Sequence, residues 1–310
     1  MNIPQKLKLI KKVSNLSQEK LAKQLGVSFV AFNAWINGRS LPREKAQDRI
    51  NDLFLRYTGQ EKIPKDILTA KKQVVLSFKN KFKNVLNLIL NNSDIYDQLI
   101  LSLTYHTNRI EGSTLTENET RAILFDNIAL ADKSIIEQLE VKNHQAALHY
   151  LLDRLKNSDK KISESFILRL HSILMNGIRK DAGSYRTHAV RIVGANVPTA
   201  NYLKVPSLIK KLIKEINRED KDVISRIAHI HSKFEKIHPF GDGNGRVGRL
   251  IIQAMLLENN LPPAIIKQEK KHFYKLYLGK SQRVGDFSQL EDFLCDAIME
   301  GLKIIERKII

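Results

Sequence analysis

The sequence predicts a mostly α-helical protein with one small β-hairpin. Apolar residues recur at helical spacing along almost the whole chain of 310 residues, and only one stretch alternates as a strand does. A hydrophobic content of 43% and a charged content of 27% are ordinary for a globular protein. Residues 57–66 read YTGQEKIPKD, with Gly, Pro and charge but no periodicity. We therefore expect a small domain over 1–58, a linker over 59–68, and a larger helical unit made of 69–160 and 161–305.

Three stretches of the larger unit carry the clearest helical pattern. They are IIEQLEVKNHQAALHYLLDRL (135–155), LIKKLIKEI (208–216) and RLIIQAMLLENN (249–260). Their apolar residues return every three or four positions, as on one face of a helix. We expect amphipathic or buried helices at all three places.

The predicted hairpin lies in THAVRIVGANVPTA, residues 187–200. Val190 and Ile192 alternate with polar neighbours, Val197 is a third such position, and the Gly-Ala-Asn that begins at Gly194 can form the turn. This is the one strand signal that we find in the chain.

Charge and cysteine content limit the classes of partner and compartment. The net charge of +18 favours nucleic acid, nucleotide phosphates or an acidic protein surface, although a generally lysine-rich composition would produce it too. The single Cys295 excludes an intramolecular disulfide and indicates a reducing compartment. The N-terminal MNIPQKLKLIKKVSNL lacks the apolar run of a signal peptide, and no segment approaches the roughly 18 apolar residues of a membrane span. We expect a cytoplasmic protein with no membrane partner.

Residues 17–42, SQEKLAKQLGVSFVAFNAWINGRSLP, predict two short helices with a tight connection. Ser17 can cap the first helix and Gly26 can end it. Ser28 can cap the second helix, which should end at Gly38. This spacing is typical of a helix-turn-helix, whose second helix enters the major groove of DNA.

The same stretch resembles the lambda-repressor/Cro-like DNA-binding family in its SQEKLA opening and its W-x-N-G-R ending. The resemblance implies DNA contacts from Gln18, Ser28, Phe29, Asn33 and Arg39. Trp35 and Ile36 are better candidates for packing. Residues 1–57 hold 11 Lys and Arg against 4 Asp and Glu, which favours phosphate attraction. The second helix is rich in apolar residues, however, so a packing or dimerisation unit without DNA contact is the alternative.

A second polar feature interrupts the helical region at IHPFGDGNGR, residues 237–246. A glycine-rich turn that leads into a helix leaves backbone N–H groups and the positive dipole end free for an anion. Arg246 and Arg249 lie one turn apart on that helix, where an anion would offset their charge. Asp242 can bind Mg²⁺ through one carboxylate, and His238 can act as a general base. Each feature alone has an ordinary structural explanation, and their combination predicts a nucleotide-triphosphate site.

The stretch HPFGDGNGRVGR resembles the signature of Fic domains, HPFx[D/E]GN[G/K]R with a second Arg three residues later. GSYRTHAVRIVG (183–194) is similar to the segment that forms the Fic flap hairpin, and HFYKLY…VGDFSQLEDFL (272–294) is similar to the C-terminal helices of the family. The resemblance covers about residues 70–305. It implies a Fic-type helical bundle with one β-hairpin flap, preceded by the small all-α helix-turn-helix domain.

This resemblance implies a protein adenylyltransferase that moves AMP from ATP to a Ser, Thr or Tyr hydroxyl with Mg²⁺. By position it assigns His238 as the general base and Asp242 as the metal ligand. It assigns Gly243, Asn244 and Gly245 to the α-phosphate region. It assigns Arg246 to the β-phosphate and Arg249 to the γ-phosphate. It assigns Tyr274 to the adenine side, where a plain core aromatic is the alternative. It also assigns Arg191, Ile192 and Val193 to strand pairing with the target peptide. Gly245 together with Arg249 favours AMP transfer over phosphate transfer.

Residues 107–112, TNRIEG, end a helix-like run at Gly112. They resemble the [S/T]xxxE[G/N] inhibitory motif of the family, and the alternative is an ordinary glutamate at a helix end. The resemblance implies that Glu111 pairs with Arg249 and excludes the γ-phosphate from its productive place. One arginine cannot serve a carboxylate and a phosphate at once.

Three functions remain open at this point. The first is AMP transfer to a protein, restrained by Glu111. The second is removal of AMP from a modified protein at the same site, with Glu111 positioning water. The third is a DNA-binding regulator whose Fic fold only senses nucleotide, which the intact His238 disfavours. The expected partners are ATP, a target protein, DNA and a second copy of the chain in a homo-oligomer.

Overall fold

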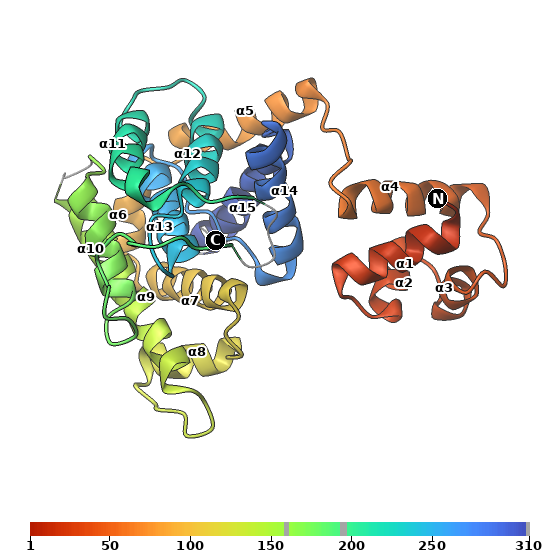
Figure 1. The fold of residues 1–310 in the computed structure, drawn as a ribbon, viewed down its shortest axis with the longest axis horizontal. Helices are drawn as coiled ribbons and strands as arrows, with labels where there is room; N and C mark the ends of the chain where they lie inside the picture. Colours follow the sequence, from red (N-terminus) through yellow and green to blue (C-terminus); the bar gives the residue numbers. More distant parts are fainter. Residues whose placement is uncertain (158–160, 193–196, 308–310) are drawn as a thin grey trace.

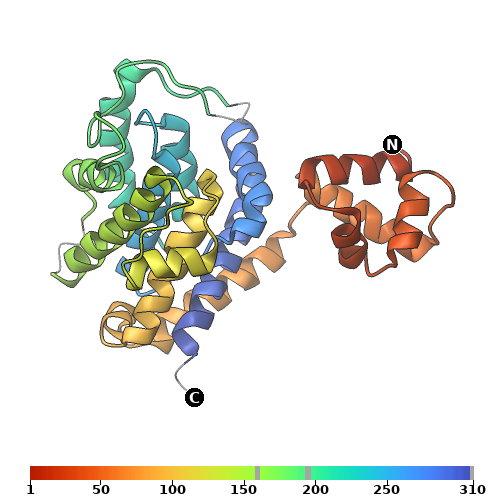
Figure 2. The ribbon, with the colours of Figure 1, turned by 90° about the horizontal axis from the view of Figure 1, so that it is seen from below.

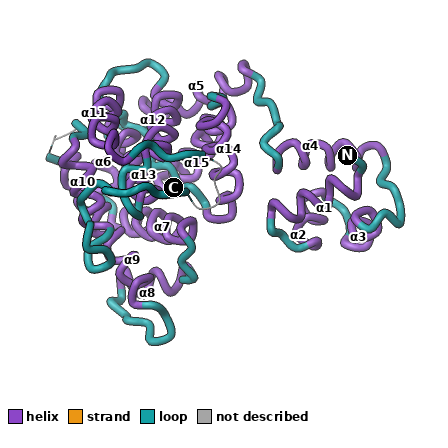
Figure 3. Tube along the Cα trace, in the orientation of Figure 1, coloured by secondary structure: helices purple, strands orange, loops and turns teal. Residues whose placement is uncertain are grey.

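The computed structural model describes residues 1–157, 161–192 and 197–307. Within these residues Figure 3 shows helices and loops but no strand. The helices are α1 (Ile3–Ser14), α2 (Gln18–Leu25), α3 (Phe29–Ile36), α4 (Glu44–Tyr57), α5 (Lys65–Lys81), α6 (Val85–Leu90), α7 (Ser93–Glu111), α8 (Glu117–Phe125), α9 (Ile135–Lys156), α10 (Glu164–Leu174), α11 (Val205–Ile216), α12 (Val223–Ile237), α13 (Asn244–Glu258), α14 (Lys271–Val284) and α15 (Ser288–Glu306), with 3₁₀ turns at Tyr202–Lys204 and Gln268–Lys270.

Helices α1 to α4 surround a core of their own, set apart from the other helices in Figures 1 and 2. Ser17 and Ser28 cap α2 and α3 as expected, and Gly26 ends α2 in the left-handed conformation. The side chains of Leu21, Ala22 and Leu25 lie in this core, together with Phe32 and Ile36 of α3. The two predicted short helices are therefore present, and both contribute side chains to this core.

Helices α5 to α15 share a second, larger core. Helix α13 lies at its centre and contacts α7, α9, α10 and α12. All its residues from Arg246 to Leu257 are buried, which explains the nearly continuous apolar run in its sequence. The predicted helices at 135–155, 208–216 and 249–260 correspond to α9, α11 and α13. The N-terminus of α13 carries the glycine-rich loop, so the core holds this loop in place.

The N-terminal helices are attached to the larger unit through α14. The rings of Tyr57 and Phe273 lie 4.8 Å apart between centroids, and Nε2 of His272 donates to the Tyr57 carbonyl oxygen at 3.1 Å. Gln289 of α15 donates from Nε2 to the carbonyl oxygen of Glu61 at 2.9 Å. The segment after α4 is therefore hydrogen-bonded to the larger unit. The division into the predicted domains stays a prediction.

The predicted β-hairpin is not confirmed. Residues 187–192 and 197–200 are irregular, and the expected turn at Gly194 lies outside the described residues. Side chains connect the two arms instead: Oγ1 of Thr199 donates to the Val190 carbonyl oxygen at 2.8 Å, and Arg186 donates to the carbonyl oxygens of His188 and Ala200. The second arm contains a proline, which lacks the N–H that a strand ladder requires.

No helix in the described ranges combines the length and apolarity that a bilayer crossing requires.

Candidate active site

The candidate site begins where α12 ends. His238 ends that helix in the left-handed conformation, with φ of 51°, and its N–H donates to the Phe234 carbonyl oxygen at 2.9 Å. Helix α13 starts six residues later, after Gly243, which has φ of 75°. A Cβ atom at Gly243 would lie 2.9 Å from Sδ of Met175, so the position favours glycine on two grounds. The predicted glycine turn into a helix N-terminus is therefore present.

Asn244 braces this loop from within. Its Oδ1 accepts from the Phe240 N–H at 2.9 Å, and its Nδ2 donates to the Phe240 carbonyl oxygen at 3.0 Å. The side chain is buried, and these two bonds commit its amide to the loop backbone. Asn244 therefore shapes the loop in this structure, and its contact with the α-phosphate stays a prediction.

His171 of α10 packs against the loop, and the sequence did not predict this contact. Its ring stacks on Phe240 with centroids 3.7 Å apart and planes 5° from parallel. Its Nδ1 accepts from the Gly183 N–H at 2.9 Å, so Nε2 carries the proton and donates to the Asp242 carbonyl oxygen at 3.1 Å. Burial lowers the pKa of His171 to about 4, which keeps the ring neutral. Its apolar helical surroundings in the sequence carry no signal for this role.

The catalytic candidate His238 has a defined tautomer. Its Nδ1 lies 3.2 Å from the Glu235 carbonyl oxygen, which can only accept, so Nδ1 carries the proton. The lone pair is then on Nε2, where a general base needs it. Burial lowers the pKa of His238 below its usual value, which favours the neutral ring.

Glu235 lies close to this base, yet sequence reasoning did not single it out. Its Oε2 is 3.9 Å from Nδ1 of His238, and its Oε1 is buried without a hydrogen-bond partner. Burial raises the pKa of Glu235 to about 7, so protonation relieves much of the cost of an unpaired buried charge.

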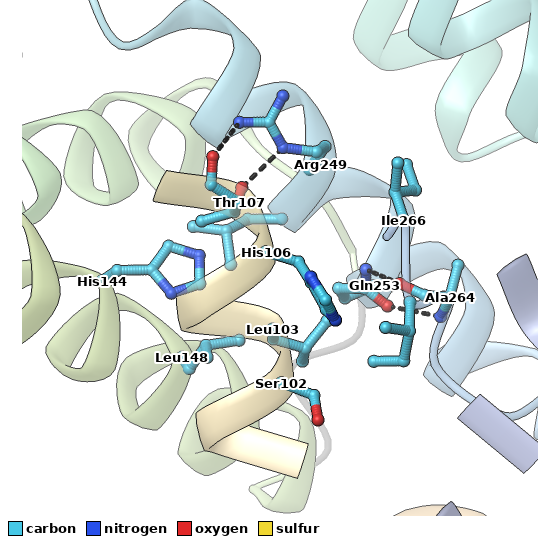
Figure 4. Close-up of a pocket in the computed structure, with 12 residues that line it drawn as sticks. Ser102, Leu103, His106, Thr107, His144, Leu148, Arg249, Gln253, Ala264 and Ile266 are labelled. Atoms are coloured by element: carbon cyan, nitrogen blue, oxygen red, sulfur yellow. Dashed lines mark hydrogen bonds between the residues drawn. The ribbon is translucent and has the colours of Figure 1, made fainter. Parts of the chain in front are cut away.

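Arg249 and Glu111 form the ion pair that the motif predicts. One terminal nitrogen of Arg249, Nη2, lies 2.5 Å from Oε1 of Glu111, and Nε donates to Oγ1 of Thr107 at 2.6 Å. Figure 4 shows Arg249 reaching from α13 to Thr107 on α7. Burial alone would raise the pKa of Glu111, but the charge and hydrogen bond of Arg249 outweigh it and hold that pKa below its usual value. The carboxylate therefore stays charged at neutral pH.

Arg246 is paired with a residue that the sequence did not identify. Its Nη1 donates to Oε1 of Glu140 on α9 at 2.6 Å, and the arginine side chain is 3% exposed. Its Nη2 lies 3.9 Å from Oδ1 of Asp242. Glu140 stands on the polar side of the 135–155 pattern, where a solvated glutamate is the ordinary expectation.

Asp242 is suited to the magnesium ion that the sequence implies. Its side chain is 59% exposed, and its Oδ1 accepts from the Gly243 N–H at 2.6 Å. Among the described residues, no group of three or more His, Cys, Asp or Glu could form a metal cage. A single open carboxylate still fits Mg²⁺, which keeps several waters and takes its other ligands from phosphates.

Among the described residues, those assigned to the flap and to the adenine side are not positioned as those roles require. Arg191 is exposed and Ile192 half-buried in the irregular first arm, while Val193 lies outside the described residues. Tyr274 is 3% exposed, and its hydroxyl lies 2.7 Å from Nε2 of His231. This tyrosine is thus a core aromatic, the alternative that the sequence left open, and it has no open face for adenine.

A cavity lies beside Arg249 and Thr107, between α7, α9 and α13 (Figure 4). His144, His106 and Gln253 also line it. Its volume of about 20 Å³ is enough for one water and far too small for a nucleotide. The cavity is therefore a gap behind the arginine and not the ATP pocket.

The predicted DNA-contact residues lie on α2, at the N-cap of α3, on α3 and in the turn after α3. Ser28, Phe29 and Arg39 are exposed, and Phe29 retains 46% of its surface. Asn33 is half-buried and donates from Nδ2 to Oε1 of Gln18 at 3.0 Å, which joins the two helices. Trp35 and Ile36 pack against the N-terminal core, as expected.

Residues 161–256 match the Fic/DOC family, a range that contains His238, the loop and both arginines. Among curated proteins, the chain is 35% identical over 190 residues to "Protein adenylyltransferase Fic" of Nematostella vectensis, covering 59% of this chain and 43% of that protein. It is 37% identical over 175 residues to "Protein adenylyltransferase fic-1" of Caenorhabditis elegans, covering 55% and 34%. The chain thus spans less than half the length of these relatives.

Solved structures agree at the level of the fold. A structure of Fic-1 from C. elegans aligns with a TM-score of 0.68 at 23% identity and covers 98% of this chain and 87% of that one. A Fic domain containing signaling protein from Bacteroides thetaiotaomicron aligns with a TM-score of 0.63 at 21% identity, covering 78% and 96%. The fold is that of Fic proteins, residues 161–256 form a Fic domain, and the chain is homologous to Fic protein adenylyltransferases.

Proposed function

We propose that this chain is a protein adenylyltransferase that transfers AMP from ATP to a Ser, Thr or Tyr hydroxyl of a target protein. One observation carries the proposal: a neutral histidine with its lone pair on Nε2 ends one helix, and two buried arginines lie on the first turns of the next. A base beside an anion-binding helix start is what in-line attack on a phosphate requires. The names of the homologous proteins support the same reaction.

In this mechanism, Nε2 of His238 takes the proton from the target hydroxyl. The hydroxyl oxygen then forms a bond to the α-phosphorus of ATP, and the bond from that phosphorus to the bridging oxygen breaks to release pyrophosphate. Arg246, Arg249 and the N-terminus of α13 offset the negative charge of the phosphates. Asp242 would hold Mg²⁺, which would neutralise part of the phosphate charge.

We further propose that Glu111 restrains this activity. Its Oε1 lies 2.5 Å from Nη2 of Arg249, the residue that we assign to the γ-phosphate. It also lies directly over the first turn of α13, because a Cβ atom added to Gly245 would collide with its Oε1. ATP in the productive pose would have to displace this carboxylate, since both cannot hold the same guanidinium edge.

DNA binding by the N-terminal helices is a second proposed function. An exposed aromatic at the start of α3, 46% open to solvent, and the exposed Arg39 support it. Arg39→Glu in the full chain should weaken duplex binding about tenfold by turning attraction to phosphate into repulsion. Lys221→Glu, at an exposed lysine of the α11–α12 loop, is the matched charge reversal. If both variants lose the same DNA affinity in gel-shift assays, the binding is general charge attraction and not a contact specific to Arg39.

Labelling tests the transfer reaction. The pure protein and a cell lysate are incubated with α-³²P-labelled ATP and Mg²⁺, using wild type, Glu111→Gly and His238→Ala. We expect stronger protein labelling with Glu111→Gly and none with His238→Ala. His149→Ala, at an exposed histidine of α9, and Glu219→Gly, in an exposed loop, are the matched controls. Absence of label in wild type and Glu111→Gly alike would refute AMP transfer, and release of AMP from a modified target would indicate the reverse reaction instead.

A further inference from the structure

The first two turns of α13 carry two arginines, and each meets a carboxylate from a different helix. Glu111 of α7 pairs with Arg249 at 2.5 Å, and Glu140 of α9 pairs with Arg246 at 2.6 Å. The two ion pairs look alike, so Glu140 could be a second restraint or a permanent support. Their surroundings distinguish these roles.

The arginines differ in what remains when the carboxylate leaves. Arg249 keeps its bond from Nε to Oγ1 of Thr107 at 2.6 Å. Arg246 is 3% exposed, and Glu140 is its one hydrogen-bond partner within the described residues. Its Nε is buried with no partner. Without Glu140, the guanidinium would be a buried cation at the positive end of a helix, and each of these conditions is unfavourable.

The carboxylates also differ in where they lie. Glu111 is 35% exposed and covers Gly245, so it lies in the path of an incoming phosphate. Glu140 is 16% exposed and binds Nη1 of Arg246, while Nη2 of the same arginine lies 3.9 Å from Asp242. Glu140 thus binds Nη1 of the guanidinium, and Nη2, beside Asp242, makes no hydrogen bond within the described residues.

We propose that Glu140 is a positioning residue that holds Arg246 with its Nη2 edge beside Asp242, where the β-phosphate of a nucleotide binds. The assignment of the nucleotide rests on the proposed function. Glu140 stays in place when the nucleotide binds, in contrast to Glu111. Loss of Glu140 therefore weakens nucleotide binding, whereas loss of Glu111 strengthens productive ATP binding.

Calorimetry with ADP and AMP and Mg²⁺ tests this assignment without requiring transfer activity. ADP lacks the γ-phosphate that Glu111 opposes, so the wild-type background is suitable. We expect Glu140→Ala to weaken ADP binding about tenfold, the size of one lost charge-assisted contact, and to leave AMP binding unchanged because AMP has no β-phosphate. Glu140→Gln keeps an acceptor oxygen without the charge, so its ADP affinity should lie between those of wild type and Glu140→Ala. It also preserves the test if Glu140→Ala does not fold.

Three results would overturn the assignment. Unchanged ADP affinity would show that Arg246 needs no support, tighter ADP binding would make Glu140 a second restraint, and equal loss of ADP and AMP in a folded variant would indicate general damage to the loop. Glu117→Ala, at an exposed glutamate of α8, is the matched control. If labelling fails in every variant while the ADP result holds, AMP transfer is refuted and the positioning role stands.

Discussion

Replacing Glu111 by glycine removes the carboxylate from Arg249 without removing the other support of that arginine. Nε of Arg249 still donates to Oγ1 of Thr107 at 2.6 Å, and Nη2 lies 3.4 Å from the Thr107 carbonyl oxygen. Glu111 is the last residue of α7, so a glycine there disturbs few helical bonds. The guanidinium should therefore stay in place with one edge open to the γ-phosphate.

The structure sets the size of the expected effect. A hydrogen bond to a charged group contributes about 1.5–3 kcal/mol. Because the Glu111 side chain is 35% exposed, solvent screens the pair, and we use the lower part of that range, about 1.5–2 kcal/mol. ATP must overcome this energy to displace the carboxylate. Its removal should lower the KM for ATP by about 10- to 30-fold, provided that binding equilibrates before transfer.

The assay is the initial rate of labelling at a series of ATP concentrations, with wild type, Glu111→Gly and Glu111→Gln. Glutamine keeps the shape and one acceptor oxygen but loses the charge, so it should lie between the other two. Glu219→Gly controls for the introduction of glycine. ADP affinity should remain the same in all of these variants, because ADP carries no γ-phosphate.

Two results would refute the reasoning. An unchanged KM for ATP in Glu111→Gly would show that the ion pair does not compete with the nucleotide. An equal gain in ADP and ATP affinity would show that Glu111 acts by covering the whole site, not by occupying Arg249.

Three further predictions concern the loop and its support. The labelling rate should fall to half only below about pH 6.5, the usual pKa of histidine. Burial lowers the pKa of His238, and a general base works only when it is unprotonated. A rate that falls to half above about pH 6.5 would contradict this prediction. The pKa of His171 is about 4 in the folded protein, so the unfolded state binds more protons between pH 6.5 and 4, and the contribution of this residue to the free energy of unfolding falls as pH falls. In urea titrations, the loss of stability from pH 6.5 to 5 should be about 1.5 kcal/mol smaller in His171→Gln than in wild type, and an equal loss in the two proteins would contradict the prediction. Gly243→Ala should lower the free energy of unfolding by about 1–3 kcal/mol, because φ is 75° and the new Cβ atom would collide with Met175. The control is Gly279→Ala, where φ is not left-handed and the Cβ atom would meet open space. This control should lower the free energy of unfolding far less in the same urea titration.

Much of the local structure around the site could be predicted from the sequence. The helices on both sides of the loop follow from apolar spacing, and the loop itself follows from three glycines and a proline within eight residues. Glu111 and Arg249 were paired through their motifs, and the structure places them in contact. The hairpin at 187–200 was expected from three alternating positions, too few to distinguish a strand from an irregular segment held by Arg186 and Thr199.

The sequence by itself determined that the candidate residues His238, Asp242 and Arg246 lie together, because they are within nine positions of one another and their geometry depends on a local turn. Only the tertiary structure decided what supports them. Glu140 reaches Arg246 across 106 positions, and His171 reaches Asp242 across 71. Such contacts depend on how helices cross in the core, and spacing along the chain contains no record of that. Burial likewise turned Tyr274 from an adenine candidate into a core residue, since burial is a property of the packed molecule.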